Sequence, residues 1–135
     1  MRRFVLAVAI LIGFLSAARA ADDAASAQAV IGSQIEAIGR GDAAAAYSYA
    51  APAVQRAFSQ PDIFMSMVRQ GYAPLVRPKS FTFGKSVVAD GKIVQQVHIV
   101  DSDGVAWEAL YSLEQQPDGS IRITGCSLLK ADQEV

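Results

Sequence analysis

Hydrophobic and polar positions along this chain follow two different periods, one before and one after about Gly71. Before it, apolar residues recur every three or four positions, as on one face of a helix, and after it they alternate every second position, as in a strand. Helices and strands in separate blocks are typical of an α+β fold. We therefore expect one α+β domain whose helices pack on a sheet.

The first block predicts two helices before residue 51. The first carries its apolar face as far as Ile38 and ends at Gly39-Arg40-Gly41, because glycine readily terminates a helix. Asp42 is placed to cap the second helix, over 43–50, with its side-chain oxygen. Pro52 then starts a further short turn, so this helix is predicted to break near residue 51.

A third helix is predicted to open at Pro61 and to end at Gly71, with this glycine as its left-handed cap. Residues 72–78 follow and contain two prolines, which lack a backbone N–H. We therefore expect an extended connector between the helices and the sheet.

Four strands are predicted in the second block, because three Asp-Gly turns divide it into alternating segments. The expected strands are 80–89, 92–101, 105–115 and 120–129. Asp90-Gly91 is a strong signal for a two-residue hairpin. The sequence therefore predicts a four-stranded antiparallel meander.

Strand register decides which side chains face the helices. Counting outward from the first hairpin pairs Val87 with Val94 and Phe83 with His98, and the next hairpin pairs His98 with Ala109. The face expected to receive the helices carries Phe81, Phe83, Val87, Val94, Gln96, His98, Val100, Trp107, Ala109, Tyr111, Leu113, Ile121 and Ile123. The opposite face is expected to carry Thr82, Val88, Ile93, Gln95, Val97, Ile99, Glu108, Leu110, Ser112, Cys126 and Leu128. This second face is too apolar for a surface fully in water, which favours a homodimer through the sheet.

The first twenty residues have the features of a secretory signal peptide. A basic start precedes an apolar run from Phe4 to Leu15, and Ala18-Arg19-Ala20 offers the small residues that a signal peptidase recognises. Extended to Ala18, the run is still shorter than the roughly 20 residues that a membrane-spanning helix needs. We expect cleavage after Ala20, a periplasmic or secreted bacterial protein, and no stable membrane anchor.

Composition and charge exclude several classes of protein. With 52% hydrophobic and 19% charged residues, the chain is far from the composition of disordered proteins. Cleavage after Ala20 would remove three arginines and no acid from a chain of net charge −1, so we expect no nucleic-acid partner. One cysteine and one histidine allow neither an internal disulfide nor a Cys-His metal site. No cofactor-binding glycine loop or nucleophile elbow is present, so we expect no cofactor.

Two resemblances follow from the order of these elements and from particular residues. Amphipathic helices, a Gly-Asp junction into an Ala-rich helix and a curved antiparallel sheet resemble the cone fold of nuclear transport factor 2, ketosteroid isomerase and the polyketide cyclases. A closer resemblance is to the bacterial domain-of-unknown-function family 4864, and it implies an exported cone-fold domain without an established activity. The residues that carry it are Phe64, Met67-Val68-Arg69, Gly71-Tyr72, Pro74, Arg77-Pro78, Phe83-Gly84, Asp103-Gly104, Trp107, Ala109, Tyr111, Gln116, Asp118-Gly119-Ser120 and Gly125-Cys126.

Five residues are candidates for ligand binding in the cone. His98 titrates near neutrality and could act as a base or bind a ligand, although no acidic partner is expected on its face, so a packed core histidine is the simpler interpretation. Trp107 and Tyr111 flank Ala109 and could line a cavity wall or simply pack in the core. Tyr72 and Arg77 could form the mouth of a pocket, where Arg77 would bind an acidic group or pair with a surface acid.

No residue of the chain is assigned a catalytic role. An isomerase of the ketosteroid type needs a carboxylate base in its cavity, and Asp101 and Glu108 are expected on the opposite face of the sheet. Cys126 has no neighbouring base, so we expect a buried and inert thiol. The sequence therefore favours a non-enzymatic exported domain that binds a small apolar ligand or a periplasmic protein. The alternative is a small cofactor-independent isomerase, cyclase or dehydratase that uses His98 with Tyr111 or Tyr47.

Overall fold

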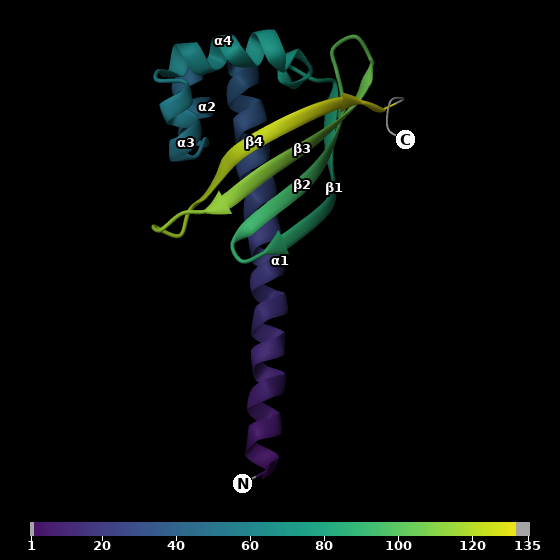
Figure 1. Ribbon diagram of the computed structural model, residues 1–135. Helices are drawn as coiled ribbons and strands as arrows, with labels where there is room; N and C mark the ends of the chain where they lie inside the picture. The colour runs from purple at the N-terminus through teal and green to yellow at the C-terminus, as the bar shows by residue number, and fades with distance from the viewer. Residues whose placement is uncertain (1, 132–135) are drawn as a thin grey trace.

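The computed structural model describes residues 2–131, and for residues 2–16 it describes the course of the backbone alone. The side chains of the predicted leader's basic start and apolar run therefore lie outside the described part, as do Met1 and residues 132–135 of the predicted domain. The described chain folds into four α-helices, one short 3-10 helix and four strands. One long helix crosses the sheet, and three short helices cluster near one end of it (Figure 1).

The first helix, α1 (Arg2–Arg40), runs unbroken through the predicted cleavage position. Among its described side chains, from residue 17 onward, the buried apolar ones begin at Ala27, and those at Ala27, Ile31, Ile35 and Ile38 follow the predicted spacing of three and four. The helix ends where the sequence predicts, because Gly41 takes a φ of 72°, which glycine adopts without strain. Among the described residues, none of the helices contains a stretch long and apolar enough to cross a membrane.

Three short helices pack beside the carboxyl end of α1: α2 (Ala43–Ser48), α3 (Pro52–Ala57) and α4 (Pro61–Gly71). The predicted cap of α2 is confirmed, since Oδ1 of Asp42 accepts a hydrogen bond from the Ala45 N–H at 3.1 Å. The predicted break before Pro52 is also confirmed. Together these helices bury a cluster of their own, which consists of Ala37, Ile38, Ala46, Ala50, Phe64, Met65 and Val68.

Two expectations for the chain between helices and sheet are wrong. The helix ends at Gly71 as predicted, but Gly71 does not adopt a positive φ, and the residue in the cap position is Tyr72, with a φ of −135°. The expected extended connector begins with a 3-10 helix, η1 (Ala73–Leu75), because Leu75 is buried and this tight turn brings it into the core. Arg77, at a φ of 51°, then turns the chain into the sheet.

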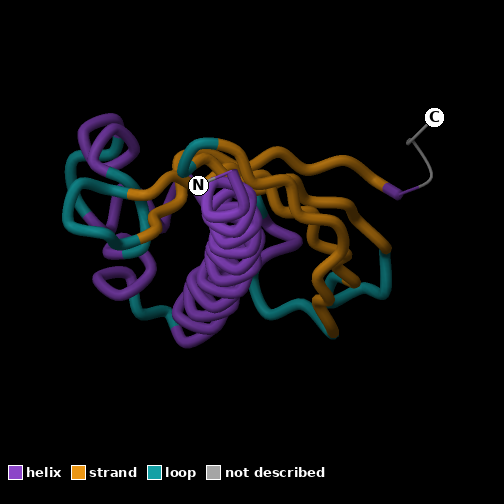
Figure 2. Tube along the Cα trace, turned by 90° about the horizontal axis from the view of Figure 1, so that it is seen from below, coloured by secondary structure: helices purple, strands orange, loops and turns teal. Residues whose placement is uncertain are grey.

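The sheet is the predicted four-stranded antiparallel meander, in the order β1 (Ser80–Ala89), β2 (Lys92–Val100), β3 (Ala106–Gln115) and β4 (Ile121–Lys130). It curves around α1, and within the described chain no helix covers its other side (Figure 2). We call the side that faces α1 the inner face and the opposite side the outer face.

The predicted faces are wrong for β2 and for half of β1, because β1 contains a bulge between Phe83 and Ser86. Val87 does pair with Val94, but the bulge exchanges the two faces along β1, so that Phe83 pairs with Val97 instead of His98. The inner side chains of these two strands are Phe81, Phe83, Val88, Ile93, Gln95, Val97 and Ile99. Val87, Val94, Gln96, His98 and Val100 belong to the outer face, contrary to expectation.

On β3 the predicted faces are correct. His98 pairs with Glu108 instead of Ala109, and this one-residue difference in the register of β2 and β3 offsets the one-residue difference between β1 and β2. A second bulge, opposite Ser112 and Leu113, shifts the register of β4. The expected inner positions of Ile121 and Ile123 are confirmed, but Cys126 and Leu128 also pack against the inner core instead of lying outside.

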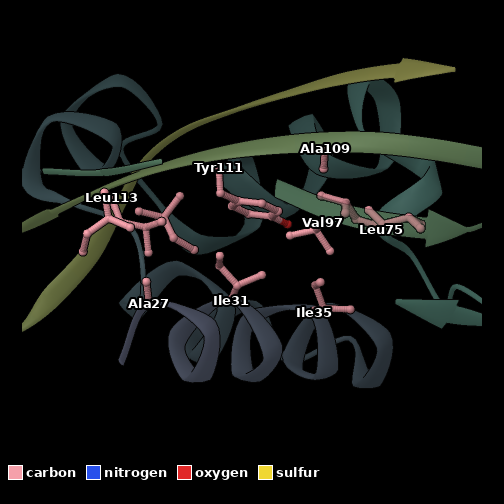
Figure 3. Packing of buried hydrophobic residues seen from close by; sticks show 11 residues of the cluster. Ala27, Ile31, Ile35, Leu75, Val97, Ala109, Tyr111 and Leu113 are labelled. Carbon is pink, nitrogen blue, oxygen red and sulfur yellow. The ribbon is translucent and has the colours of Figure 1, made fainter. Parts of the chain in front are cut away.

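The main core lies between the inner face and α1, where Ala27, Ile31 and Ile35 meet side chains of β2 and β3 (Figure 3). Tyr111 is the largest fully buried side chain of the described protein, and its ring lies at the centre of this layer (Figure 3). The short helices close one end of the cone, and a cavity remains between them and the sheet.

Candidate functional site

A cavity of about 180 Å³, partly open to solvent, lies where α1, the short helices and the inner face of the sheet meet. Its apolar lining consists of Ile38, Ala50, Val54, Phe58, Phe64, Met67, Val68, Leu75 and Ile123. Its polar groups come from Gln34, Tyr72, Tyr111, Thr124 and Cys126, and Gly125 completes the lining. No lining residue carries a charge, so the cavity is suited to a neutral ligand.

The hydroxyl of Tyr111 is the unusual group of this cavity. It is shielded from solvent and, among the residues that the structure describes, has no hydrogen-bond partner. The Cys126 thiol lies beside it, but not in hydrogen-bonding geometry. Burial, and then the neighbouring Cys126 and Tyr72, raise the pKa of Tyr111 well above its ordinary value. The group is therefore a neutral hydroxyl with unused hydrogen-bonding capacity.

The other polar groups of the lining are mostly engaged or unreactive. The Tyr72 hydroxyl donates to the backbone carbonyl of Cys126 at 2.9 Å, which ties the end of α4 to β4. The Gln34 side chain is buried, and its Nε2 donates to the Ala46 carbonyl at 3.2 Å. Burial raises the pKa of the Cys126 thiol to about 12, so this cysteine stays protonated at neutral pH.

Of the five predicted site residues, the structure brings only Tyr72 and Tyr111 to the cavity. Trp107 lies on the inner face, as predicted, but away from the cavity, where its Nε1 donates to Oδ2 of Asp101 at 2.9 Å. The Arg77 Nε donates to the Gly39 carbonyl at 2.9 Å and so fixes the connector to the end of α1. Whether Tyr72 and Tyr111 bind a ligand stays a prediction.

His98 differs most from expectation. It lies on the outer face with 49% of its side chain exposed, and its Nδ1 contacts Oε1 of Glu108, the acidic partner that the sequence reading did not expect on its face. Glu108 itself is buried, and its Oε2 has no hydrogen-bond partner among the described residues. The imidazole lies over Gly84 in the β1 bulge. A Cβ atom added at Gly84 would come within 2.8 Å of the His98 Nε2. His98 is therefore neither a core histidine nor a cavity residue.

The position of His98 on the outer face leaves the cavity without the base that the alternative function, a small enzyme, would use. The cavity lining holds tyrosines but no aspartate, glutamate, histidine or lysine that could take a proton near neutrality. Within the described chain, no three side chains of the kinds that ligate metals gather at one place. The arrangement can enclose a small neutral molecule and offer it one hydrogen bond.

Two lining residues had a signal in the sequence that was not used. Gln34 lies within the apolar stripe that Ile31, Ile35 and Ile38 form, and a polar residue on such a stripe indicates a polar group facing the interior. Cys126, which is partly buried, was placed on the wrong face because of the bulge in β4, and Gly125 at this bulge was the unused signal.

The comparisons with known proteins agree with this architecture. The family described as "Domain of unknown function (DUF4864)" matches residues 20–135. Among solved structures, an NTF-2-like protein of unknown function from Silicibacter pomeroyi DSS-3 is similar, with 16% identity and a TM-score of 0.52 over 78% of this chain and 93% of that one. No curated protein matches the chain. The resemblances inferred from the sequence are thus confirmed: the chain belongs to the DUF4864 family of unknown function and has an NTF-2-like cone fold.

Proposed function

We propose that this protein binds a small, neutral, largely apolar molecule in the cavity of its cone. The observation that carries the proposal is a charge-free apolar cavity into which one unpartnered hydroxyl, that of Tyr111, is built. An unpartnered buried hydroxyl destabilises a fold by about 1–3 kcal/mol. A bound molecule that accepts or donates one hydrogen bond would remove this penalty.

The size of the cavity limits the ligand. An apolar cavity of roughly 150 Å³ accommodates benzene. The cavity of about 180 Å³ therefore has room for a molecule of roughly seven or eight non-hydrogen atoms. With about 0.7 kcal/mol of binding free energy for each such atom, an affinity in the range of about 0.1–1 mM is expected.

Three probes of similar size test the proposal: toluene, p-cresol and benzoate. We expect toluene and p-cresol to shift amide resonances of the cavity residues, with p-cresol binding more tightly because it can bond to Tyr111. Benzoate should not bind, because its carboxylate would be buried without a partner.

A matched pair of variants locates the binding. Val54→Phe adds a ring to the cavity lining and should abolish the shifts caused by toluene. Val105→Phe makes the same change at an exposed position after β2 and should leave them unchanged. The proposal fails if neither toluene nor p-cresol binds to the folded protein, or if Val54→Phe binds them as the unaltered protein does.

We also propose that the protein is exported after loss of its first twenty residues. The leader pattern in the sequence supports this, and so does the family match from residue 20. Mass spectrometry of protein from cells that express the full-length gene should find a chain starting at Ala21. A chain that keeps the leader would contradict the proposal.

A further inference from the structure

Residues 52–60 cover one side of the cavity without contributing a buried side chain to either core. They comprise α3 and the turn that follows it, and α3 lies at the margin of the cluster of short helices (Figure 1). Val54 and Phe58 line the cavity from this segment, and both are only half-buried. On either side of the segment, Ala51 and Phe64 are buried. We call residues 52–60 the flap.

Most of the other walls of the cavity belong to the packed interior. Six of the lining residues are buried in the two cores: Ile38, Phe64, Val68, Leu75, Tyr111 and Ile123. An outward movement of these residues would expose apolar core to water, and each exposed side chain would cost free energy. Segments with few buried apolar contacts open most readily. The flap is therefore the part of the wall that is easiest to move.

Three hydrogen bonds tie the flap to the chain before it. Nε2 of Gln55 donates to the backbone carbonyls of Tyr47 and Ala50, at 3.0 and 3.2 Å. In return, the Tyr47 hydroxyl donates to the Gln55 carbonyl at 2.9 Å. We call these three bonds the latch. Phe58 adds an edge-to-face contact with Phe64, whose ring centroid is 6.3 Å away. A change at Gln55 alone can therefore remove two of the three bonds of the latch.

Extended residues at both ends of the flap can act as hinges. Ala51 has a φ of −68° and a ψ of 159°, and Gln60 has a φ of −143° and a ψ of 152°. The chain at the first hinge is fixed to the sheet, since the Ala51 N–H donates to the Ile123 carbonyl at 2.8 Å. The chain after the second hinge is held by Phe64 in its core. Because lids move by rotation at a few residues at the ends of elements, the flap can turn while both anchors stay in place.

Phe58 and Met67 separate the cavity from a hollow on the surface. Both side chains line the cavity, and both also line the hollow beside α4, together with Asp62, Ile63, Ser66 and Gln70. The two side chains therefore form a wall between the two spaces. Because Phe58 belongs to the flap, an outward turn of the flap would join the cavity to the hollow.

We propose that the flap is a lid, which turns at Ala51 and Gln60 and admits the ligand between Phe58 and Met67. This inference rests on the proposed function, because it concerns how a ligand reaches the cavity. The latch holds the lid closed, so its strength sets the fraction of molecules in which the cavity is open. The lid thus sets how fast a ligand enters and leaves.

Amide hydrogen exchange of the ligand-free protein tests whether the flap opens by itself. The protein is purified from cells that express the full-length gene. A six-residue helix is unstable without its packing, so the Phe58 N–H, which bonds to the Val54 carbonyl, exchanges whenever the flap opens. The Ile123 N–H, which bonds to the Tyr49 carbonyl at 2.9 Å, is the reference in the core. We expect the protection factor of Phe58 to be at least about tenfold lower than that of Ile123.

Two variants separate opening of the flap from unfolding of the whole domain. Gln55→Leu removes two bonds of the latch and should accelerate exchange at Phe58 about tenfold. Asp101→Asn weakens the fold at the turn between β2 and β3, where the Asp101 side chain accepts from the Val105 N–H at 2.9 Å. It should accelerate exchange at Ile123 and leave Phe58 unchanged. If circular dichroism shows that Gln55→Leu is unfolded, Tyr47→Phe removes the third bond of the latch instead.

The rates of ligand binding test the role of the lid. Line shapes of amide resonances during a titration with p-cresol give the association and dissociation rates. Gln55→Leu should raise both rates by the same factor, about tenfold, and leave the affinity within about twofold. Asp101→Asn should change neither rate.

A flap that opens ahead of the core and sets both p-cresol rates supports the proposal. Equal protection of Phe58 and Ile123 overturns it, and so does a folded Gln55→Leu variant whose two rates are unchanged or whose affinity alone changes. If p-cresol and toluene do not bind while Phe58 still exchanges ahead of Ile123, the proposed function fails and the opening of the flap is supported.

Discussion

Replacing Tyr111 with phenylalanine should stabilise the protein, although it removes a polar group from the centre of the fold. The hydroxyl is buried and has no hydrogen-bond partner among the described residues, so the folded state has lost its hydration without compensation. Such a loss amounts to about 1–3 kcal/mol. The small void left by the oxygen offsets part of the gain. We therefore expect the free energy of unfolding to rise by about 1 kcal/mol.

The same substitution at two other tyrosines provides the control. The hydroxyl of Tyr72 donates to the Cys126 carbonyl, and that of Tyr47 donates to the Gln55 carbonyl, each at 2.9 Å. Tyr72→Phe and Tyr47→Phe each delete a hydrogen bond and leave a carbonyl unpaired, so each should lower stability by about 1 kcal/mol. One chemical change should thus have opposite signs, because the hydroxyl is bonded at the two partly buried control positions and unbonded at the fully buried Tyr111.

Urea unfolding at neutral pH, followed by circular dichroism, measures these differences. One kcal/mol corresponds to a shift of the urea midpoint by roughly 0.3–1 M for a small domain. Destabilisation by Tyr111→Phe of the same size as in the controls would refute the reasoning, because it would mean that the hydroxyl is bonded, for example to water in the cavity. If Tyr111→Phe is more stable and also binds p-cresol more weakly, the hydroxyl is kept for ligand binding at the expense of stability.

Three further predictions concern other parts of the molecule. Because burial raises the pKa of Cys126 to about 12, iodoacetamide should not modify it in the folded protein at pH 8, but should do so in guanidinium, as mass spectrometry can show. The N–H groups of Val105 and Trp107 hold the pKa of Asp101 below its ordinary value, so its contribution to stability is complete above about pH 4 and is lost as the pH falls further. Asp101→Asn should therefore lower the urea midpoint at pH 7 and bring the midpoints at pH 7 and pH 3 closer together. Gly84→Ala should lower stability by about 1 kcal/mol in the same assay, because the new methyl group would come too close to the side chains of Gln96 and His98 and displace them; an unchanged midpoint would contradict this.

The sequence predicts the order and ends of the elements well, because local signals set them. Asp42 caps its helix, Pro52 and Pro61 begin theirs, and the Asp-Gly pairs turn the chain between strands. Each of these residues acts through its own backbone or that of near neighbours, so it can be interpreted without knowledge of the fold.

The faces of the strands are predicted poorly, because one inserted position exchanges them. The bulge between Phe83 and Ser86 leaves Phe81 inside while it places Val87 outside, and a strict alternation cannot reproduce both. Gly84, at the bulge, was the available signal, because an isolated glycine within a strand often marks one. The error moved His98 into the expected cavity and so produced a site that the structure does not have.

The cavity was predicted only in part, since its lining comes from helices and strands far apart in the chain. Tyr111 was identified as an aromatic residue on the predicted inner face, and Tyr72 as part of the predicted mouth of a pocket. The contributions of Val54, Phe58 and Met67 depend on how the short helices close the cone, which their own periodicity does not determine. Which side chains share a cavity is a property of tertiary packing.

The unbroken course of α1 imposes an order of events on the maturation that we propose. Ala20 and Ala21 lie within one continuous helix, in which the peptide bond between them is engaged in backbone hydrogen bonding. Peptidases act on segments that are unfolded or locally opened. The leader would therefore be removed during export, while the chain is still extended and before α1 forms. Afterwards Asp22 and Asp23 would stand in the first turn of the shortened helix, where their negative charges favour its amino end. A chain that folded first would be a poor substrate for the peptidase.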